Sequence, residues 1–179
     1  MSWLQKFYFL RAGVAVAWIA LVVITAPAAL PLAIALLVLY PAWDAFANWL
    51  DAQQSGGLAL NKGQMFNMIV SVITAICVGI AVSLHGNAGG VLVFGSWALL
   101  AGVFQLAVGI ARRKLGGQVF MMISGAQSAL AGVVFIYQSF RVAPGLVQLT
   151  GYAAFGAFYF LAAGLWLTFK KNRAARAIA

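Results

Sequence analysis

Acidic residues are the scarcest charged class in this sequence: Asp44 and Asp51 are the only two among 179 residues. Charged residues of both signs make up only 7% of the chain, whereas soluble domains carry about 25%. A soluble fold cannot cover its surface with so few charges. The composition therefore excludes an ordinary soluble globular domain.

Cysteine and histidine are almost missing as well. The single cysteine, Cys77, excludes an intrachain disulfide and a cysteine-rich metal site, and the single histidine, His85, is a poor metal site by itself. The sequence contains no GxSxG, no GxGxxG and no phosphate-binding loop. We therefore expect no enzyme activity, no metal site and no cofactor.

Hydrophobic residues dominate what is present, at 65% of the chain. They occur in runs of about 20 residues, which is enough to cross a bilayer, and runs such as "AGVAVAWIALVVI" lack the alternation of a β-barrel strand. The prediction is an all-α polytopic membrane protein, a single domain of six transmembrane helices in three helical hairpins. The spans are expected at 7–26, 30–50, 65–85, 90–111, 118–139 and 146–169, followed by a basic cytoplasmic tail at 170–179.

The basic residues predict the orientation of these spans. With the N-terminus inside, ten of the eleven lysines and arginines lie on the inner side, and only Arg141 lies outside. Cytoplasmic loops of membrane proteins carry such an excess of positive charge. We therefore expect both termini in the cytoplasm, and we assign the net charge of +9 to topology and not to nucleic-acid binding.

Both acidic residues lie in one stretch, "YPAWDAFANWLD" at 40–51. If residue 28 is the tip of the first hairpin, Arg11 and Asp44 lie 17 and 16 residues from it, and Lys6 and Asp51 lie 22 and 23 residues from it. Equal counts in antiparallel helices mean equal depth. The spacing thus predicts structural ion pairs at the inner end of this hairpin. A carboxylate that serves a proton or substrate path, or acids solvated at the interface, are the alternatives.

Polar residues inside the expected spans form a second pattern. Asn67, Ser71 and Thr74 share one helix face, and Gln105 and Gln127 lie in two other spans. Buried polar groups in a membrane need partners, so these side chains are expected to form hydrogen bonds between helices. A polar path or a small-molecule pocket at the centre of the bundle is the alternative.

Small residues also recur at helical spacing, and close approach of small residues drives helix association in lipid. We expect them to pack helices together, with a glycine-lined cleft as the alternative. The expected packing residues are Ala98, Gly102, Gly109, Gly125, Ala129, Gly132 and Gly156.

Internal repetition leads to a family resemblance. "WALLAGVFQLAVGI" at 97–110 aligns with "YAAFGAFYFLAAGL" at 152–165. Together with "MMISGAQSALAGVVFIYQ", these segments resemble the short-repeat membrane proteins of the HdeD-like family over about residues 64–171. The resemblance implies six helices in three hairpins, a bacterial inner membrane, a stress-related setting and no established catalytic residues. "YPAWDAFANWLD" departs from the family pattern.

Two functions fit these observations. The first is a small non-enzymatic accessory or structural protein that binds membrane lipids and forms a homo-oligomer or joins a larger membrane complex. The lack of charge deep in the spans after residue 64 favours it, because ion-coupled transporters keep an ionisable residue at depth. The alternative is a channel or transporter for a small neutral or weakly polar solute.

Overall fold

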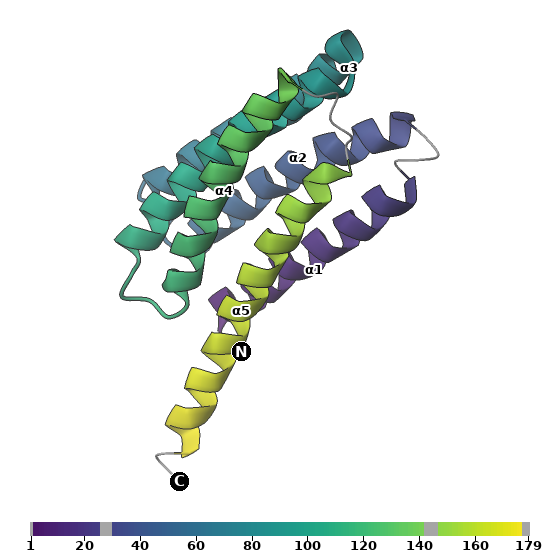
Figure 1. The fold of residues 1–179 in the computed structure, drawn as a ribbon. Coiled ribbons are helices and arrows are strands. Elements are labelled where there is room, and N and C mark those ends of the chain that lie inside the picture. The colour runs from purple at the N-terminus through teal and green to yellow at the C-terminus, as the bar shows by residue number, and fades with distance from the viewer. Residues whose placement is uncertain (1, 26–29, 142–146, 177–179) are drawn as a thin grey trace.

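The chain folds entirely into helices and their connections in the part that the computed structural model describes, which comprises residues 2–25, 30–141 and 147–176. Residues 26–29, 142–146 and 177–179 lie outside the described residues. They include the connection expected between the first two spans, most of the connection expected between the last two, and the end of the basic tail. The helices are α1 (Trp3–Thr25), α2 (Leu30–Gln54), α3 (Lys62–Ala111), α4 (Gln118–Ser139) and α5 (Gln148–Arg176). Figure 1 shows them as a bundle with both chain ends at its lower end.

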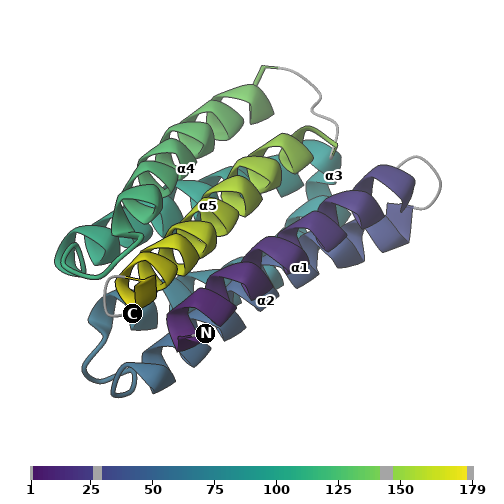
Figure 2. The same ribbon diagram turned by 90° about the horizontal axis from the view of Figure 1, so that it is seen from below.

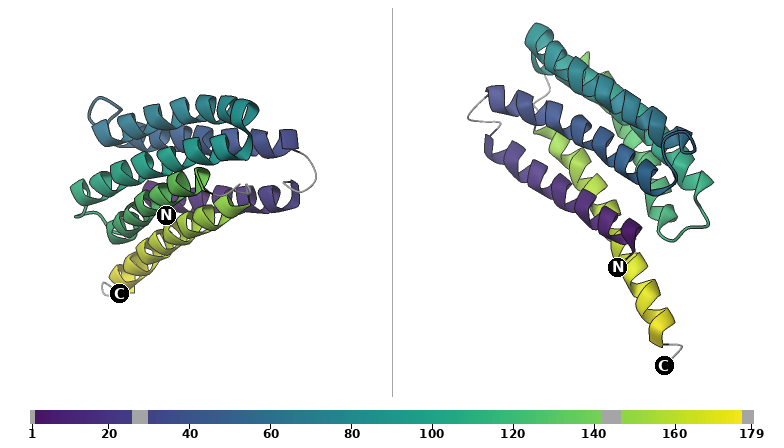
Figure 3. Two further views of the ribbon diagram at one scale, coloured as in Figure 1. Left: turned by 45° about the horizontal axis from the view of Figure 1, so that its top comes forward. Right: turned by 180° about the vertical axis from the view of Figure 1, so that it is seen from behind.

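The expectation of six separate helices is corrected here to five, because residues 62–111 form the single element α3. The helix changes direction at Gly86, which has φ 62° and ψ −155°, a conformation that a residue without a Cβ adopts at little cost. Its two arms then lie antiparallel (Figure 3): Trp97 Nε1 donates to Ser71 Oγ at 2.8 Å, and Phe66 stacks on Phe104. One non-helical residue replaces the turn that the expected spans left at residues 86–89.

Glycines bring the second arm of α3 against α4. A Cβ on Gly102 would lie 2.4 Å from the Ala129 backbone nitrogen, and a Cβ on Gly132 would lie 2.4 Å from the Leu99 nitrogen. Both distances are shorter than real contacts, so only glycine permits this approach. Gly95 belongs to the same contact, although the sequence analysis missed it.

The bundle buries two hydrophobic clusters at different depths. One includes Trp18, Leu37 and Phe94, and the other includes Phe7 and Phe160. Seen from below, α5 lies between α4 and α1 (Figure 2), and it packs mainly on α1. Helix α5 continues to Arg176, so the residues expected to form a separate basic tail begin as helix.

Apolar side chains also cover much of the outside, with Ile24, Leu84 and Leu130 each about 70% exposed. Four helices of the described chain are long and apolar enough to cross a membrane: α1, α3, α4 and the Gln148–Arg173 part of α5. The apolar exterior and the helix lengths are those of a helical membrane protein.

Candidate functional site

The two acidic side chains meet arginines at two levels of the bundle. Arg11 Nη2 donates to Asp44 Oδ1, which joins α1 to α2 as their equal distance from the hairpin tip predicted. Asp51 pairs with Arg112 at 2.7 Å, and the expected Lys6–Asp51 pair is not formed. The physical reason is helix rotation: Lys6 shares the depth of Asp51 but points outward, whereas Asp51 faces the end of α3.

Asp44 is the centre of a buried hydrogen-bond network and is only 7% exposed. Its Oδ2 accepts from Asn48 Nδ2 at 3.0 Å and from Ser71 Oγ at 2.9 Å. Ser71 Oγ in turn accepts from Trp97 Nε1. A buried carboxylate is tolerated when its charge and lone pairs are satisfied in this way. The network therefore provides partners for both carboxylate oxygens of Asp44 and ties α2 to both arms of α3.

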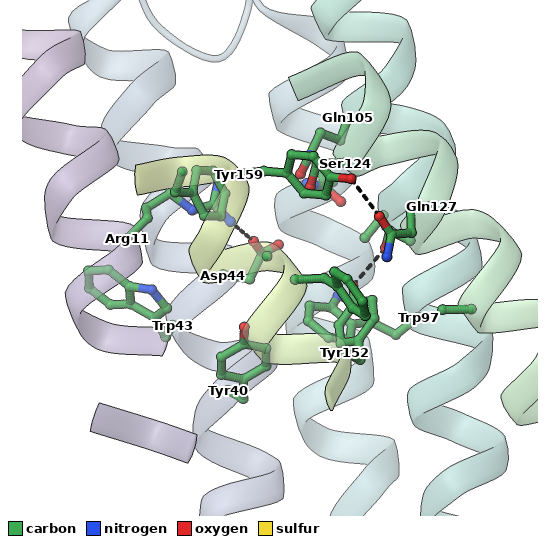
Figure 4. Close-up of a pocket in the computed structure, with 17 residues that line it drawn as sticks. Arg11, Tyr40, Trp43, Asp44, Trp97, Gln105, Ser124, Gln127, Tyr152 and Tyr159 are labelled. Carbon is green, nitrogen blue, oxygen red and sulfur yellow. Dashed lines mark hydrogen bonds and ion pairs between the residues drawn. The ribbon is translucent and has the colours of Figure 1, made fainter. Parts of the chain in front are cut away.

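A cavity of about 70 Å³ opens beside this ion pair (Figure 4). It lies between the two hydrophobic clusters, and every helix contributes to its wall. A site of this size has room for several water molecules, each of which needs about 10–15 Å³. The main polar and aromatic residues of the wall are Arg11, Tyr40, Trp43, Asp44, Asn67, Trp97, Gln105, Ser124, Gln127, Ser128, Tyr152 and Tyr159.

The wall opposite the ion pair is polar and comes from α4 and α5. Tyr159 donates its hydroxyl proton to Gln127 Oε1 at 2.8 Å, which leaves the Gln127 amide nitrogen as a donor (Figure 4). Ser128 Oγ lies 2.7 Å from the Tyr152 hydroxyl. These bonds fix two tyrosine rings against the cavity.

Two residues that line the cavity each contain a buried side-chain atom without a hydrogen-bond partner among the described residues. The atoms are Arg11 Nε, a donor, and Asn67 Oδ1, an acceptor. Asn67 is 6% exposed, so bulk solvent hardly reaches it. Buried polar atoms without partners are rare in folded proteins.

A second cavity continues toward the end of the bundle that holds the termini. It shares Arg11, Asn67, Gln105 and Phe160 with the central cavity, so these residues lie where the two meet. Its far wall contains the Asp51–Arg112 pair, to which Gln64 donates at 3.0 Å. The polar lining is therefore continuous between the two levels of charge.

The predicted polar-path residues separate into two groups. Asn67, Gln105 and Gln127 border the central cavity, whereas Ser71 is fully enclosed by the Asp44 network. Thr74 is buried and borders neither cavity. The helix face that carries Asn67, Ser71 and Thr74 thus runs from the cavity into packed protein.

The predicted packing residues also separate. Gly102, Gly109, Gly125 and Gly132 make the close α3–α4 contact, to which the buried Ala98 and the half-buried Ala129 belong. Gly156 is corrected: a Cβ there would meet nothing within 4 Å, and Gly156 lines the central cavity instead. The spacing of small residues places Gly156 in a helix, but it does not show that Gly156 faces the cavity and not a neighbouring helix.

Sequence reasoning missed the aromatic lining of the cavity. Tyr40, Trp97, Tyr152 and Tyr159 stand in apolar runs, where aromatic residues usually serve as core. A hydroxyl or indole N–H in such a run needs a hydrogen-bond partner, and this need could have indicated that these residues border a polar site. Trp97 and Tyr152 contact each other edge to face, with ring centroids 6.2 Å apart.

The described residues contain no group of three or more His, Cys, Asp or Glu side chains that could hold a metal ion. The cavity wall offers hydrogen bonding and aromatic contact around a compensated ion pair. Comparison of the chain with protein-family models, curated proteins and solved structures found no match.

Proposed function

We propose that this chain is an integral membrane protein that binds a small uncharged polar solute in the central cavity and provides a path for it across the membrane. The observation that carries the proposal is the cavity between the two hydrophobic clusters, with the Arg11–Asp44 pair in its wall. Ionisable residues within a membrane bundle face its interior or a water-filled cavity and mark solute pathways.

The proposal includes six crossings of the bilayer. A straight helix of 50 residues would be about 75 Å long, far more than the ~30 Å of a hydrocarbon core. The reversal at Gly86 gives α3 two arms of membrane-spanning length. With α1, α2, α4 and α5, the chain then crosses six times, and both termini lie in the cytoplasm with the basic residues.

The charge of the cavity wall favours an uncharged solute. Arg11 and Asp44 compensate each other, and Asn48 and Ser71 satisfy the second carboxylate oxygen. An ion that entered would lose its hydration without gaining an unpaired counter-charge. A neutral solute loses less and gains hydrogen bonds from polar atoms such as the Gln127 amide.

The accessory-subunit function, which the sequence alone favours, is supported by the short loops, the small-residue helix faces and the lack of deep charge after residue 64. The first hairpin supplies a charged pair to the shared cavity, so the lack of charge in the later spans does not decide between the two functions. The HdeD-like resemblance and the bacterial inner-membrane location stay predictions. We adopt the channel or transporter function because it gives the cavity a role.

Solute flux into proteoliposomes tests the proposal. Stopped-flow light scattering would follow swelling in urea, acetamide and glycerol, and we expect rates above those of empty liposomes for at least one solute. Gly156→Phe should remove the excess rate, because Gly156 lines the cavity and its missing side chain faces free space.

Gly151→Phe is the matched control. Gly151 lies in the same helix, a Cβ there would also meet nothing within 4 Å, and Gly151 does not border the cavity. It should keep the wild-type rate. Rates equal to empty liposomes for the whole panel, or equal rates in both variants, would contradict the proposal.

A further inference from the structure

An open groove with two aromatic and two basic side chains runs along the last turns of α5. It has a volume of about 330 Å³ and is lined by Trp166, Phe169, Lys170 and Arg173, which we call the α5 groove. The last three follow Trp166 at 3, 4 and 7 residues, so all four share one face of the helix. All four are also exposed, with Trp166 at 52% and Phe169 at 63%. The α5 groove is therefore accessible from outside the bundle.

Helix α5 leaves the bundle within this groove. Gln5 of α1 donates to Thr168, and the Phe120 ring of α4 contacts the Trp166 ring with centroids 6.3 Å apart. Beyond these contacts α5 extends past the N-terminal end of α1 (Figures 1 and 3). The bundle thus holds the aromatic end of the groove, and the basic end lies on the part of α5 that extends from the bundle.

The position of the groove along α5 matches the inner edge of a membrane. About 20 residues cross the hydrocarbon core, so a crossing that begins at Gln148 ends near residue 168. Trp166 then lies at the boundary that tryptophan prefers, and Arg173 lies about 10 Å farther out, at the depth of the headgroups. The groove therefore offers apolar contact on the hydrocarbon side and positive charge on the aqueous side. A phospholipid carries its acyl chains and its phosphate in the same order.

The positive charge of the groove has no carboxylate partner within the described part of the chain. Asp44 and Asp51, the only acidic residues, pair with arginines inside the bundle. The segment at 112–117 adds two exposed basic residues nearby, because a Cβ on Gly116 would lie 2.7 Å from the Leu167 side chain. The charge at this end of the bundle is thus complementary to an anion.

We propose that the α5 groove binds an anionic phospholipid of the inner leaflet, with an acyl chain against Trp166 and Phe169 and the phosphate group against Lys170 and Arg173. Basic residues just outside a membrane helix attract anionic headgroups, and arginine forms charge-assisted hydrogen bonds with phosphate. A zwitterionic lipid brings a cation of its own, and free phosphate lacks the acyl chain. The inference uses the membrane location in the proposed function but does not depend on the solute path.

Native mass spectrometry of the full chain in detergent tests the inference, because it resolves each adduct by mass. Phosphatidylglycerol is anionic, phosphatidylcholine with the same acyl chains has no net charge, and inorganic phosphate is the anion without a lipid. We expect phosphatidylglycerol to bind with a Kd about tenfold or more below that of the other two, a ratio that about 1.4 kcal/mol produces. Equal binding of phosphatidylcholine or of inorganic phosphate would overturn the inference.

Charge-matched variants locate the binding on the groove. Lys170→Gln/Arg173→Gln should raise the Kd of phosphatidylglycerol about tenfold. Lys171→Gln/Arg113→Gln is the control, because it also removes one exposed lysine and one exposed arginine, and neither lines the groove. It should raise the Kd less than about threefold. Equal losses in the two variants would mean a general attraction to the basic end of the bundle and would overturn the groove as the site.

Two phenylalanines of α5 test the acyl-chain contact. Phe169 and Phe158 are 63% and 61% exposed, and only Phe169 lines the groove. Phe169→Ala should raise the Kd of phosphatidylglycerol about threefold or more, and Phe158→Ala should leave it unchanged. Equal effects would contradict the acyl-chain contact.

The outcomes also separate this inference from the proposed function. If solutes cross proteoliposomes while phosphatidylglycerol binds no better than phosphatidylcholine, the lipid site is overturned and the solute path stands. If phosphatidylglycerol binds selectively while no solute crosses, the lipid site stands and the solute path is overturned.

Discussion

Asp44 depends on Arg11 more than on any other side chain, because Arg11 supplies the compensating charge in a buried setting. Their side chains are 10% and 14% exposed. Removing one partner of a buried pair leaves the other charge stranded, which typically costs about 3–5 kcal/mol. The pair therefore stabilises the fold and shapes the cavity at the same time.

A double-mutant cycle tests this coupling. Asp44→Asn and Arg11→Gln should each lower the free energy of unfolding by about 3–5 kcal/mol, and the double mutant should recover part of the sum. Thermal unfolding in detergent measures all three. Arg113→Gln, at an exposed arginine, is the control and should change little. Strictly additive losses would show that Arg11 and Asp44 do not act as a pair.

The second acidic residue gives a separate prediction, because Asp51 pairs with Arg112 and not with Lys6. Arg112→Gln should lower thermal stability by about 1–3 kcal/mol, since it also loses the bond to Asn61. Lys6→Gln should change it by less than about 0.5 kcal/mol, as surface substitutions do. The same unfolding assay compares them, and a larger loss in Lys6→Gln would restore the sequence-based pairing.

Residue patterns predicted the Arg11–Asp44 pair but not the cavity. The number of residues from the hairpin tip predicts how deep a side chain lies in each of two antiparallel helices. Arg11 and Asp44 lie at the same depth, and their side chains also face each other. The same counting failed for Lys6 because depth does not give helix rotation. Asn67, Gln105 and Gln127 were recognised as a set, but which of them are exposed to free space depends on how α4 and α5 pack.

At the scale of elements, the contact between the second arm of α3 and α4 holds the far wall of the cavity in place. Gly95, Gly102 and Gly109 recur every seven residues in α3, and Gly125 and Gly132 do so in α4. At Gly102, Gly125 and Gly132 a backbone atom of the facing helix lies too close to leave room for a methyl group. Such close approach is what small residues provide between membrane helices.

Gly102→Ala tests this contact, because its Cβ would lie 2.4 Å from a backbone atom and the helices would have to separate. Overpacking of this kind costs about 1–3 kcal/mol. Gly151→Ala adds the same methyl where nothing lies within 4 Å, and alanine should even gain up to about 1 kcal/mol of helix propensity. Thermal unfolding compares the two. Equal stability would mean that α3 and α4 tolerate a wider separation.

Element positions were largely predictable, because long apolar runs with few alternatives define them. The span expected at 118–139 coincides with α4, and the one at 30–50 lies within α2. The join at Gly86 was not predictable in detail. "HGNAGG" signals a turn, but the sequence does not reveal that one residue suffices and that both neighbours stay helical.

At the scale of the whole molecule, the proposed topology follows from how the connections divide between the two ends of the bundle. Both termini and the segments at 55–61 and 112–117 lie at one end, and the reversal at Gly86 lies at the other (Figures 1 and 3). Lys62 and Arg113 thus share an end with the basic part of α5. This distribution agrees with the positive-inside rule.

Reporter fusions test the topology. Fusions after Lys62 and Arg113 should be active only with a cytoplasmic reporter, and a fusion after Asn87 only with an external one. The expected alternation requires both arms of α3 to cross the membrane. A cytoplasmic result at Asn87 in a well-expressed fusion would contradict the six crossings.

The most direct measurement of the central claim is the reaction rate of a cysteine in the cavity wall with a small water-soluble thiol reagent. Cys77→Ala provides the background, because Cys77 is exposed. Ser124 and Thr74 are equally buried, at 8% and 6% exposed, but only Ser124 borders the central cavity. If the cavity admits water and solute, Ser124→Cys reacts in membranes and Thr74→Cys stays unreacted. Equal rates at the two positions, or a Ser124→Cys that never reacts, would contradict a solute-accessible cavity at the centre of the bundle.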